Sequence, residues 1–223
     1  MMGEGRSDDA FTVLVVCTGN ICRSAMAERL GRDYLRETLG DAAADIQLIS
    51  AGTNAVVGSA MHPDSALVLA GFGGDPAGFV ARQLDERIAG AADLTLTMTR
   101  KHRAAVLSAA PRALARTFTL REAAELVDLL DEERLPGATF AEQGRELVKR
   151  MAAMRSRRPT SRTDDIADPI GQTVEVHQFV GDQIAEALLP VLACLVELHP
   201  AVADVTSGPG EDGGTGSRLF LVP

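Results

Sequence analysis

Hydrophobic and polar positions divide the first forty residues into a strand and a helix. The run "FTVLVV" at residues 11–16 is apolar and rich in β-branched side chains, which is typical of a parallel strand buried on both faces. From Ser24 to about Leu39, apolar residues recur every four positions, and this spacing predicts a helix whose opposite side, including Glu28, faces water. A short loop therefore joins a buried strand to the start of a helix.

The rest of the chain repeats this alternation of strands and helices. Because strands that alternate with helices pair in parallel, the sequence predicts an α/β fold with a central parallel four-stranded sheet and helices on both faces. Further strands are expected at residues 45–53, 92–98 and 115–120, and further helices at 63–70, 100–107, 120–130 and 174–198, the last one kinked at Pro190.

Composition divides the chain into one ordered domain and two polar ends. We expect residues 1–10 to be a flexible N-terminus, residues 11–200 to form the domain, and residues 201–223, which contain "SGPGEDGGTGS", to be disordered. Residues 131–163 are charged and punctuated by proline and glycine, which indicates a surface insertion with a helix near residues 141–154. Its arginines are typical of a solvated loop, or of a surface for an acidic or phosphorylated partner: Arg155, Arg157, Arg158 and Arg162.

Charge and cysteine content narrow the setting. The 22 basic and 31 acidic residues give a net charge of −9, which argues against a nucleic-acid surface or an anionic membrane surface and favours a protein or small-molecule partner. Three cysteines are too few for a secreted disulfide framework, and the first ten residues hold no apolar signal segment, so we expect a cytoplasmic protein. The four histidines show no metal-ligand spacing, which predicts no metal site.

The loop after the first strand, "CTGNICRS" at residues 17–24, carries the candidate chemistry. A loop in this position gathers backbone N–H groups at the positive end of a helix dipole and favours a bound phosphate. The same field favours the thiolate of Cys17, which makes it a candidate nucleophile. Arg23 can hold two phosphate oxygens through its planar guanidinium. The arrangement predicts attack of Cys17 on a bound phosphate group.

Such an attack expels an alkoxide or phenoxide, which needs a proton donor. The segment "DDIADPIG" at residues 164–171 offers three carboxylates. Asp168 is preferred because Pro169 restricts its backbone to an extended conformation and a glycine follows. Asp164 and Asp165 are the competing candidates.

The loop resembles the Cys-x5-Arg-Ser signature of the low-molecular-weight protein tyrosine phosphatases. The resemblance continues through "ISAGT", "FVARQL", "ADLTLTM" and the Asp-Pro pair, and covers residues 11–130 and 164–198. It implies a hydrolase that removes phosphate from phosphotyrosine in a phosphorylated protein through a phosphocysteine intermediate, without a metal or organic cofactor. Cys17 would be the nucleophile, Arg23 the phosphate clamp and Asp168 the acid that later activates water.

The resemblance also assigns the residues around the nucleophile. Ser50 would support the loop, and Cys22 would form a protective disulfide with Cys17 under oxidation. The phosphate-binding loop itself would consist of Thr18, Gly19, Asn20, Ile21, Cys22 and Ser24.

Several positions depart from the family pattern and leave alternatives open. Ile21 occupies a position where threonine is associated with phosphoarginine specificity, so isoleucine favours phosphotyrosine. Relatives usually carry aromatic residues just after the Asp-Pro pair, whereas this chain has Ile170 and Gly171, and Phe79 lies where many relatives have a histidine. A phosphoarginine phosphatase, a thiol-dependent arsenate reductase and a phosphate-binding module without catalysis are therefore the alternatives to a phosphotyrosine phosphatase.

Overall fold

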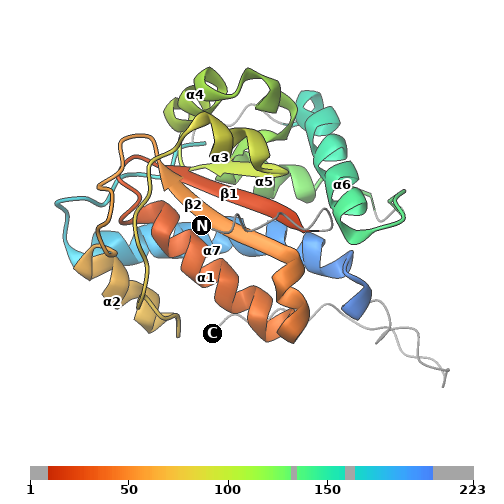
Figure 1. The fold of residues 1–223 in the computed structure, drawn as a ribbon. Coiled ribbons are helices and arrows are strands. Elements are labelled where there is room, and N and C mark those ends of the chain that lie inside the picture. Colours follow the sequence, from red (N-terminus) through yellow and green to blue (C-terminus); the bar gives the residue numbers. More distant parts are fainter. Residues whose placement is uncertain (1–9, 132–134, 159–163, 203–223) are drawn as a thin grey trace, which may run out of the picture.

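Four parallel strands form one sheet in the order β2-β1-β3-β4 in the computed structural model, which describes residues 10–131, 135–158 and 164–202 (Figure 1). Cys17 pairs with Gly52, and Val16 pairs with Thr97, so the carboxyl ends of the first three strands meet at one edge. The predicted parallel sheet is confirmed. Its strands are β1 (Phe11–Cys17), β2 (Ile46–Gly52), β3 (Leu94–Thr97) and β4 (Thr117–Thr119).

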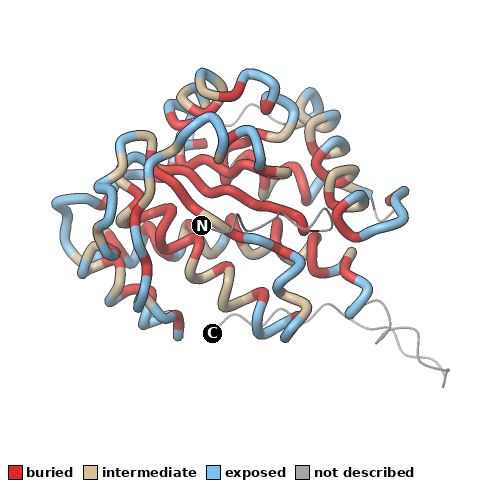
Figure 2. The backbone as a smooth tube through the Cα atoms, viewed as in Figure 1, coloured by how far each residue is buried: buried red, intermediate tan, exposed pale blue. Residues whose placement is uncertain are grey.

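Helices cover both faces of the sheet, as predicted. One face is covered by α1 (Arg23–Leu39), α5 (Leu120–Val127) and α7 (Val174–Glu197), and the other packs against α3 (Glu86–Ala91) and α4 (Arg100–Ala109) (Figure 1). Helix α2 (Pro63–Gly71) packs on α1 and α7. Side chains of β1 alternate between two cores, with Val13 and Val15 in the larger core and Leu14 and Val16 in the smaller one. The sheet is therefore buried on both sides (Figure 2), which explains why β1 is apolar at nearly every position.

Polar caps fix where several helices begin. Thr119 and Glu122 form a capping box at the start of α5, and Thr139 and Glu142 form another at the start of α6 (Phe140–Met154). Asp85 caps α3 by accepting a hydrogen bond from the Ile88 backbone N–H. Helix α3 is absent from the predicted elements because six residues hold too little periodicity. Three short 3-10 segments complete the fold, η1 (Gly40–Asp45), η2 (Pro111–Arg116) and η3 (Arg155–Arg157).

The predicted helix in the middle of the insertion is present as α6, and one of its faces belongs to the core. A Cβ at Gly144 would lie 2.8 Å from the Phe11 ring, so α6 packs directly on the first residue of β1. Because Phe11 and Cys17 are the two ends of a seven-residue strand, α6 lies about 20 Å from the loop after β1. It supports the fold at the end of the sheet remote from that loop (Figure 1).

Two of the insertion's arginines make internal contacts. The guanidinium of Arg155 stacks over the Phe118 ring, with its Cζ 4.1 Å from the centroid, and pairs with Glu122 at 3.0 Å. Arg158 pairs with Glu125 at 2.6 Å and with a carboxylate C-terminal to the insertion. These two side chains therefore tie the end of the insertion to β4 and α5, and they are neither fully solvated nor available to a partner.

Helix α7 is long and apolar enough, by length and composition alone, to cross a membrane. Its apolar residues instead pack against α1, α2 and α5, as in the core helix of a globular domain. The helix continues through Pro190 to Glu197. The expected flexible N-terminus and disordered tail lie outside the described residues, except for Ala10, Ala201 and Val202, and so does Arg162.

Candidate active site

The loop between β1 and α1 places a thiol among hydrogen-bond donors. Cys17 is the last residue of β1, and its Sγ lies 2.9 Å from the Ser24 Oγ in the first turn of α1. The backbone N–H of Asn20 points to the same sulfur at 3.3 Å. Cys17, Asn20 and Ser24 are all buried. The loop thus curls around the sulfur, as the phosphate-cradle prediction requires.

Asn20 holds the loop in this shape. Its backbone has a φ of 56°, a left-handed conformation that a non-glycine residue keeps only when its surroundings enforce it. Its amide nitrogen donates to the Ser24 Oγ at 2.9 Å and to the Ser50 Oγ at 2.8 Å, and its amide oxygen accepts from the Arg82 backbone N–H at 2.8 Å. Because the Ser24 oxygen accepts from Asn20, its own hydrogen is free to point to the Cys17 sulfur.

Glu28 completes this network from α1, and the prediction that it faces water is wrong. Its carboxylate is almost fully buried, accepts a hydrogen bond from the Ser50 Oγ at 2.6 Å, and pairs with Arg32 at 3.0 Å and Arg82 at 3.8 Å. Helical periodicity shows which residues share a face but not how much of the helix the sheet and the loop after β2 cover. Ser50 therefore links Asn20 of the loop to the Glu28 carboxylate.

Arg23 lies at the opposite end of the loop and is held by the segment that precedes α7. Its Nη1 donates to the Ile166 carbonyl at 3.0 Å, and its Nη2 pairs with the Asp168 Oδ2 at 2.5 Å. Its Nε is buried and has no hydrogen-bond partner among the described residues. A buried cationic N–H with no partner fits an anionic ligand.

Only one of the three candidate carboxylates contacts Arg23. Asp165 accepts a hydrogen bond from the Arg100 backbone N–H at the start of α4, and Asp164 pairs with Arg158. Asp168 remains partly exposed, with 42% of its side chain accessible. Asp168 therefore combines access to solvent with a direct contact to Arg23. The two competing candidates make no contact with Arg23.

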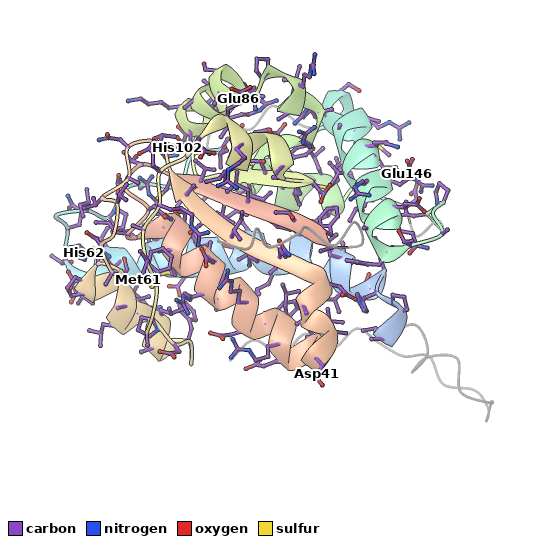
Figure 3. All side chains as sticks on the ribbon, viewed as in Figure 1. Asp41, Met61, His62, Glu86, His102 and Glu146 are labelled. Carbon is purple, nitrogen blue, oxygen red and sulfur yellow. The ribbon has the colours of Figure 1, made fainter. Side chains whose placement is uncertain are left out.

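His102 contacts the loop from α4, a role that its sequence position did not reveal. Its Nε2 lies 2.9 Å from the Thr18 Oγ1, and its Nδ1 lies 2.9 Å from the Thr99 Oγ1. Figure 3 shows His102 at the carboxyl end of the sheet. Burial, together with the nearby Arg23 cation, lowers the pKa of His102 to about 4. A neutral imidazole therefore links α4 to the first residue after the thiol.

Aliphatic side chains surround the mouth of the loop. A Cβ at Gly19 would contact both Ile21, at 3.5 Å, and Val56, at 3.7 Å. The Val56 backbone N–H donates to the Gly19 carbonyl at 3.0 Å, and about half of the Val56 side-chain surface remains exposed. Gly52 lets β2 approach the loop, since a Cβ there would lie 2.4 Å from the Thr18 carbonyl oxygen. An apolar surface therefore lies beside the phosphate-binding loop.

The second loop cysteine has a different environment from Cys17. Burial raises the pKa of Cys22 to about 11, although a hydrogen bond with Ser65 opposes this shift. Two of the histidines, which show no metal-ligand spacing along the chain, meet in the fold. The rings of His62 and His177 stack with centroids 4.9 Å apart, and both lie beside Cys22.

Phe79, at the position where many relatives have a histidine, is buried under the Arg29 guanidinium.

Comparisons with known proteins agree with this geometry. A family model described as low molecular weight phosphotyrosine protein phosphatase matches residues 12–154. The probable low molecular weight protein-tyrosine-phosphatase EpsP of Ralstonia nicotianae is 35% identical over 139 residues, which cover 62% of this chain and 89% of EpsP. The low molecular weight protein-tyrosine-phosphatase Wzb of Escherichia coli K12 is 33% identical over 129 residues, which cover 58% of this chain and 82% of Wzb.

The fold agrees as well. The structure of the low molecular weight protein tyrosine phosphatase from T. tengcongensis superposes with a TM-score of 0.60 at 25% identity, and the match covers 83% of this chain and 99% of that chain. A family model that spans well over half of the chain, together with this superposition, leads to one assignment. The chain belongs to the low molecular weight phosphotyrosine protein phosphatase family.

Proposed function

We propose that this protein dephosphorylates phosphotyrosine in proteins, with Cys17 as nucleophile, Arg23 as phosphate clamp and Asp168 as general acid and base. The observation that carries the proposal is the placement of the Cys17 sulfur and the Arg23–Asp168 pair at the two ends of one short loop. The nucleophile, the anion-binding group and the proton donor of a phosphomonoesterase are thus assembled from three segments.

The proposed first step forms a phosphocysteine. The Cys17 thiolate attacks phosphorus, the bond between phosphorus and the tyrosine oxygen breaks, and protonated Asp168 gives its proton to the departing phenoxide. Loop N–H groups and Arg23 hold the phosphoryl oxygens, where charge develops. The buried, unpartnered Arg23 Nε supports this role.

The proposed second step is hydrolysis. The Asp168 carboxylate takes a proton from water, the resulting oxygen bonds to phosphorus, and the phosphorus–sulfur bond breaks. The Ser24 hydroxyl, at 2.9 Å from the sulfur, stabilises the thiolate as it leaves. Inorganic phosphate departs, and Cys17 and Asp168 are ready for the next cycle.

The aliphatic residues at the mouth of the loop favour an aromatic substrate. Ile21 and Val56 offer apolar contact for a phenyl ring, whereas the planar, charged guanidinium of phosphoarginine gains no polar partner from them. Ile170 is 48% exposed and lies two residues after Asp168, where it adds a third aliphatic side chain in place of the family's usual aromatic residues. These side chains support phosphotyrosine over phosphoarginine.

Competing functions lack equivalent support. An arsenate reductase needs further thiols near the nucleophile, and among the described residues only Cys22 shares the loop with Cys17. A cytoplasmic location fits the proposal, because a reducing compartment keeps Cys17 as a free thiol. The test is a comparison of purified protein on phosphotyrosine, phosphoarginine and phosphoserine peptides, with arsenate reduction measured in parallel. We expect phosphotyrosine hydrolysis to dominate, and a preference for any other substrate would reject the assignment.

A further inference from the structure

Three potential metal ligands from separate elements meet beside the phosphate-binding loop. Cys22 belongs to the loop, His62 precedes α2, and His177 lies in the first turn of α7. Each offers one ligand atom, and these three atoms lie within 4.8 Å of one another. The clustering of two imidazoles and a thiol is typical of sites for Zn²⁺ and related divalent metals.

One ring nitrogen of each histidine in this cluster is buried. The Nδ1 of His62 and the Nε2 of His177 have no hydrogen-bond partner, and the His177 side chain is fully buried. A buried polar atom without a partner costs free energy unless a ligand satisfies it.

Asp64 lies close to both histidines of this cluster. Its Oδ2 lies 3.8 Å from the His62 Nδ1 and 4.0 Å from the His177 Nε2. Ligand atoms of a tetrahedral zinc ion with bonds of about 2.0–2.3 Å are about 3.3–3.8 Å apart, so the Asp64 carboxylate is near the distance from each histidine that a shared metal ion requires. Asp64 is partly exposed on the first turn of α2. Figure 3 shows His62 beside the start of α2.

A hydroxyl group orients the most deeply buried ligand. The Ser65 Oγ lies 2.9 Å from the Nδ1 of His177, which directs the Nε2 of the same ring toward the cluster. Metal-bound histidines generally have such a partner on the second ring nitrogen. The arrangement therefore includes both the ligands and the group that holds one of them in place.

We propose that Cys22, His62, His177 and Asp64 form a binding site for a divalent metal ion of the Zn²⁺ type. The metal replaces the thiol proton of Cys22, which passes to solvent, and no oxidation or reduction takes part. The bound ion ties the loop, α2 and α7 together next to Arg23 and keeps Cys22 from bridging to Cys17. The sequence prediction of no metal site missed this cluster because its ligands come from three segments that only the fold brings together.

Cobalt spectroscopy of the untagged full chain tests the proposal. Co²⁺ added to the wild type should produce the visible bands of tetrahedral cobalt and a near-ultraviolet thiolate-to-cobalt band, and Zn²⁺ should displace both. Cys22→Ser should lose the thiolate band, whereas Cys17→Ser and Cys194→Ser should keep it. Loss of the band in Cys17→Ser would place the metal at the catalytic thiol and overturn the proposal, as would its survival in Cys22→Ser or the absence of saturable binding.

Two variants outside the loop test the proposal even if the Cys22→Ser protein fails to fold. Ser65→Ala should weaken Co²⁺ binding by about 10- to 100-fold, the usual effect of removing the partner of a ligating histidine. His62→Asn should weaken it at least as much and should abolish the rise in Tm that Zn²⁺ produces in the wild type. Unchanged cobalt affinity and an unchanged rise in Tm in His62→Asn would overturn the proposal whatever the behaviour of Cys22→Ser.

Discussion

Arg23 and Asp168 are 145 positions apart in the chain, yet their side chains meet at 2.5 Å between the Nη2 and the Oδ2. The contact joins the end of the phosphate-binding loop to the segment before α7. It fixes a carboxyl group next to the guanidinium that is proposed to hold the phosphate. The proposed proton donor and the proposed phosphate clamp are thereby held next to each other before any substrate arrives.

Removal of this carboxyl group should slow the chemical step. We expect Asp168→Ala to lower kcat by about 10²- to 10⁴-fold, the usual contribution of a general acid. The loss should be larger for aryl phosphates with poor leaving groups, because these depend most on protonation. The measurement is a series of kcat values for aryl phosphates whose leaving groups differ in pKa.

Asp165→Ala is the matched control, since Asp165 lies three residues away and contacts Arg100 instead of Arg23. It should leave this dependence on the leaving group unchanged. If Asp165→Ala reproduces the loss and Asp168→Ala does not, the acid has been assigned to the wrong carboxylate.

The buried Glu28 should stabilise both the fold and the loop. Glu28→Ala leaves the Ser50 hydroxyl and two guanidinium groups without their shared partner, so we expect the free energy of unfolding to fall by about 2 kcal/mol. The turnover rate should fall as well, because Asn20 keeps its left-handed conformation partly through Ser50. Urea unfolding and steady-state kinetics measure the two effects.

Glu37→Ala provides the comparison on the same helix, because Glu37 is exposed near the end of α1. It should change the unfolding free energy by less than about 0.5 kcal/mol. Equal effects of the two substitutions would show that the Glu28 network contributes nothing specific.

The pKa of His102 predicts a pH dependence of stability. In the unfolded chain its imidazole has a pKa of about 6.5, whereas in the fold the value is lowered to about 4. Between these values the unfolded state binds a proton that the folded state does not, so the stability due to neutral His102 is complete above about pH 6.5 and is lost as the pH falls toward 4. The expected loss by pH 4 is about 3 kcal/mol.

His102→Gln tests this dependence, since the amide keeps a polar contact for Thr18 but does not titrate. Unfolding free energies of the wild type and the variant, measured from pH 4 to pH 7, should differ increasingly in favour of the wild type as the pH rises. A constant difference would mean that His102 titrates alike in the folded and unfolded states.

The side chain of Ile21 should set the choice between phosphotyrosine and phosphoarginine. Ile21→Thr removes apolar surface beside the phosphate and introduces a hydroxyl that accepts hydrogen bonds from a guanidinium. We expect the ratio of kcat/KM for phosphoarginine over phosphotyrosine peptides to rise about tenfold or more. Ile21→Val, which keeps the apolar contact, should leave the ratio nearly unchanged. An unaltered ratio in Ile21→Thr would show that Ile21 does not set the choice of substrate, and Val56 and Ile170 would be the next candidates.

Oxidation should link the two loop cysteines. Peroxide converts Cys17 to a sulfenic acid, and attack by the Cys22 sulfur expels water and forms a disulfide that a dithiol reductant can reverse. In chelator-treated protein, the wild type should recover most of its activity after reduction, and Cys22→Ser should recover much less. Peptide mapping should find the Cys17–Cys22 bridge in the inactivated wild type. Equal recovery in both proteins, without a bridge, would exclude this protection.

Local sequence patterns predict the sheet and the loop well because the features that specify them are adjacent in the chain. The apolar run of β1, the loop from Cys17 to Arg23 and the first helix follow one another directly, and the structure has them in that order. Burial of Glu28 could not be predicted, because it depends on Ser50 and Arg82 from other segments. The only sequence signal for the burial of Glu28 is its position as a charged residue in the first turns after the loop.

The contacts of His102, His62 and His177 likewise could not be predicted from the sequence. Each depends on how α4, α2 and α7 approach the loop, and no spacing along the chain encodes these approaches. The choice of Asp168 among the three candidate aspartates has a local sequence basis, because Pro169 restricts the backbone of Asp168 alone. Only the structure, however, shows that Asp164 and Asp165 are paired with arginines elsewhere.

The account rests above all on Cys17 as the nucleophile, and the hydrolysis rate of a phosphotyrosine peptide by Cys17→Ser tests it most directly. We predict that turnover falls by about 10⁴-fold or more, while Cys194→Ser, which alters a cysteine in α7, keeps the wild-type rate. The backbone cradle and Arg23 are unchanged in Cys17→Ser, so the variant should still bind inorganic phosphate and lose only the chemical step. Hydrolysis by Cys17→Ser at a rate near that of the wild type would contradict the account.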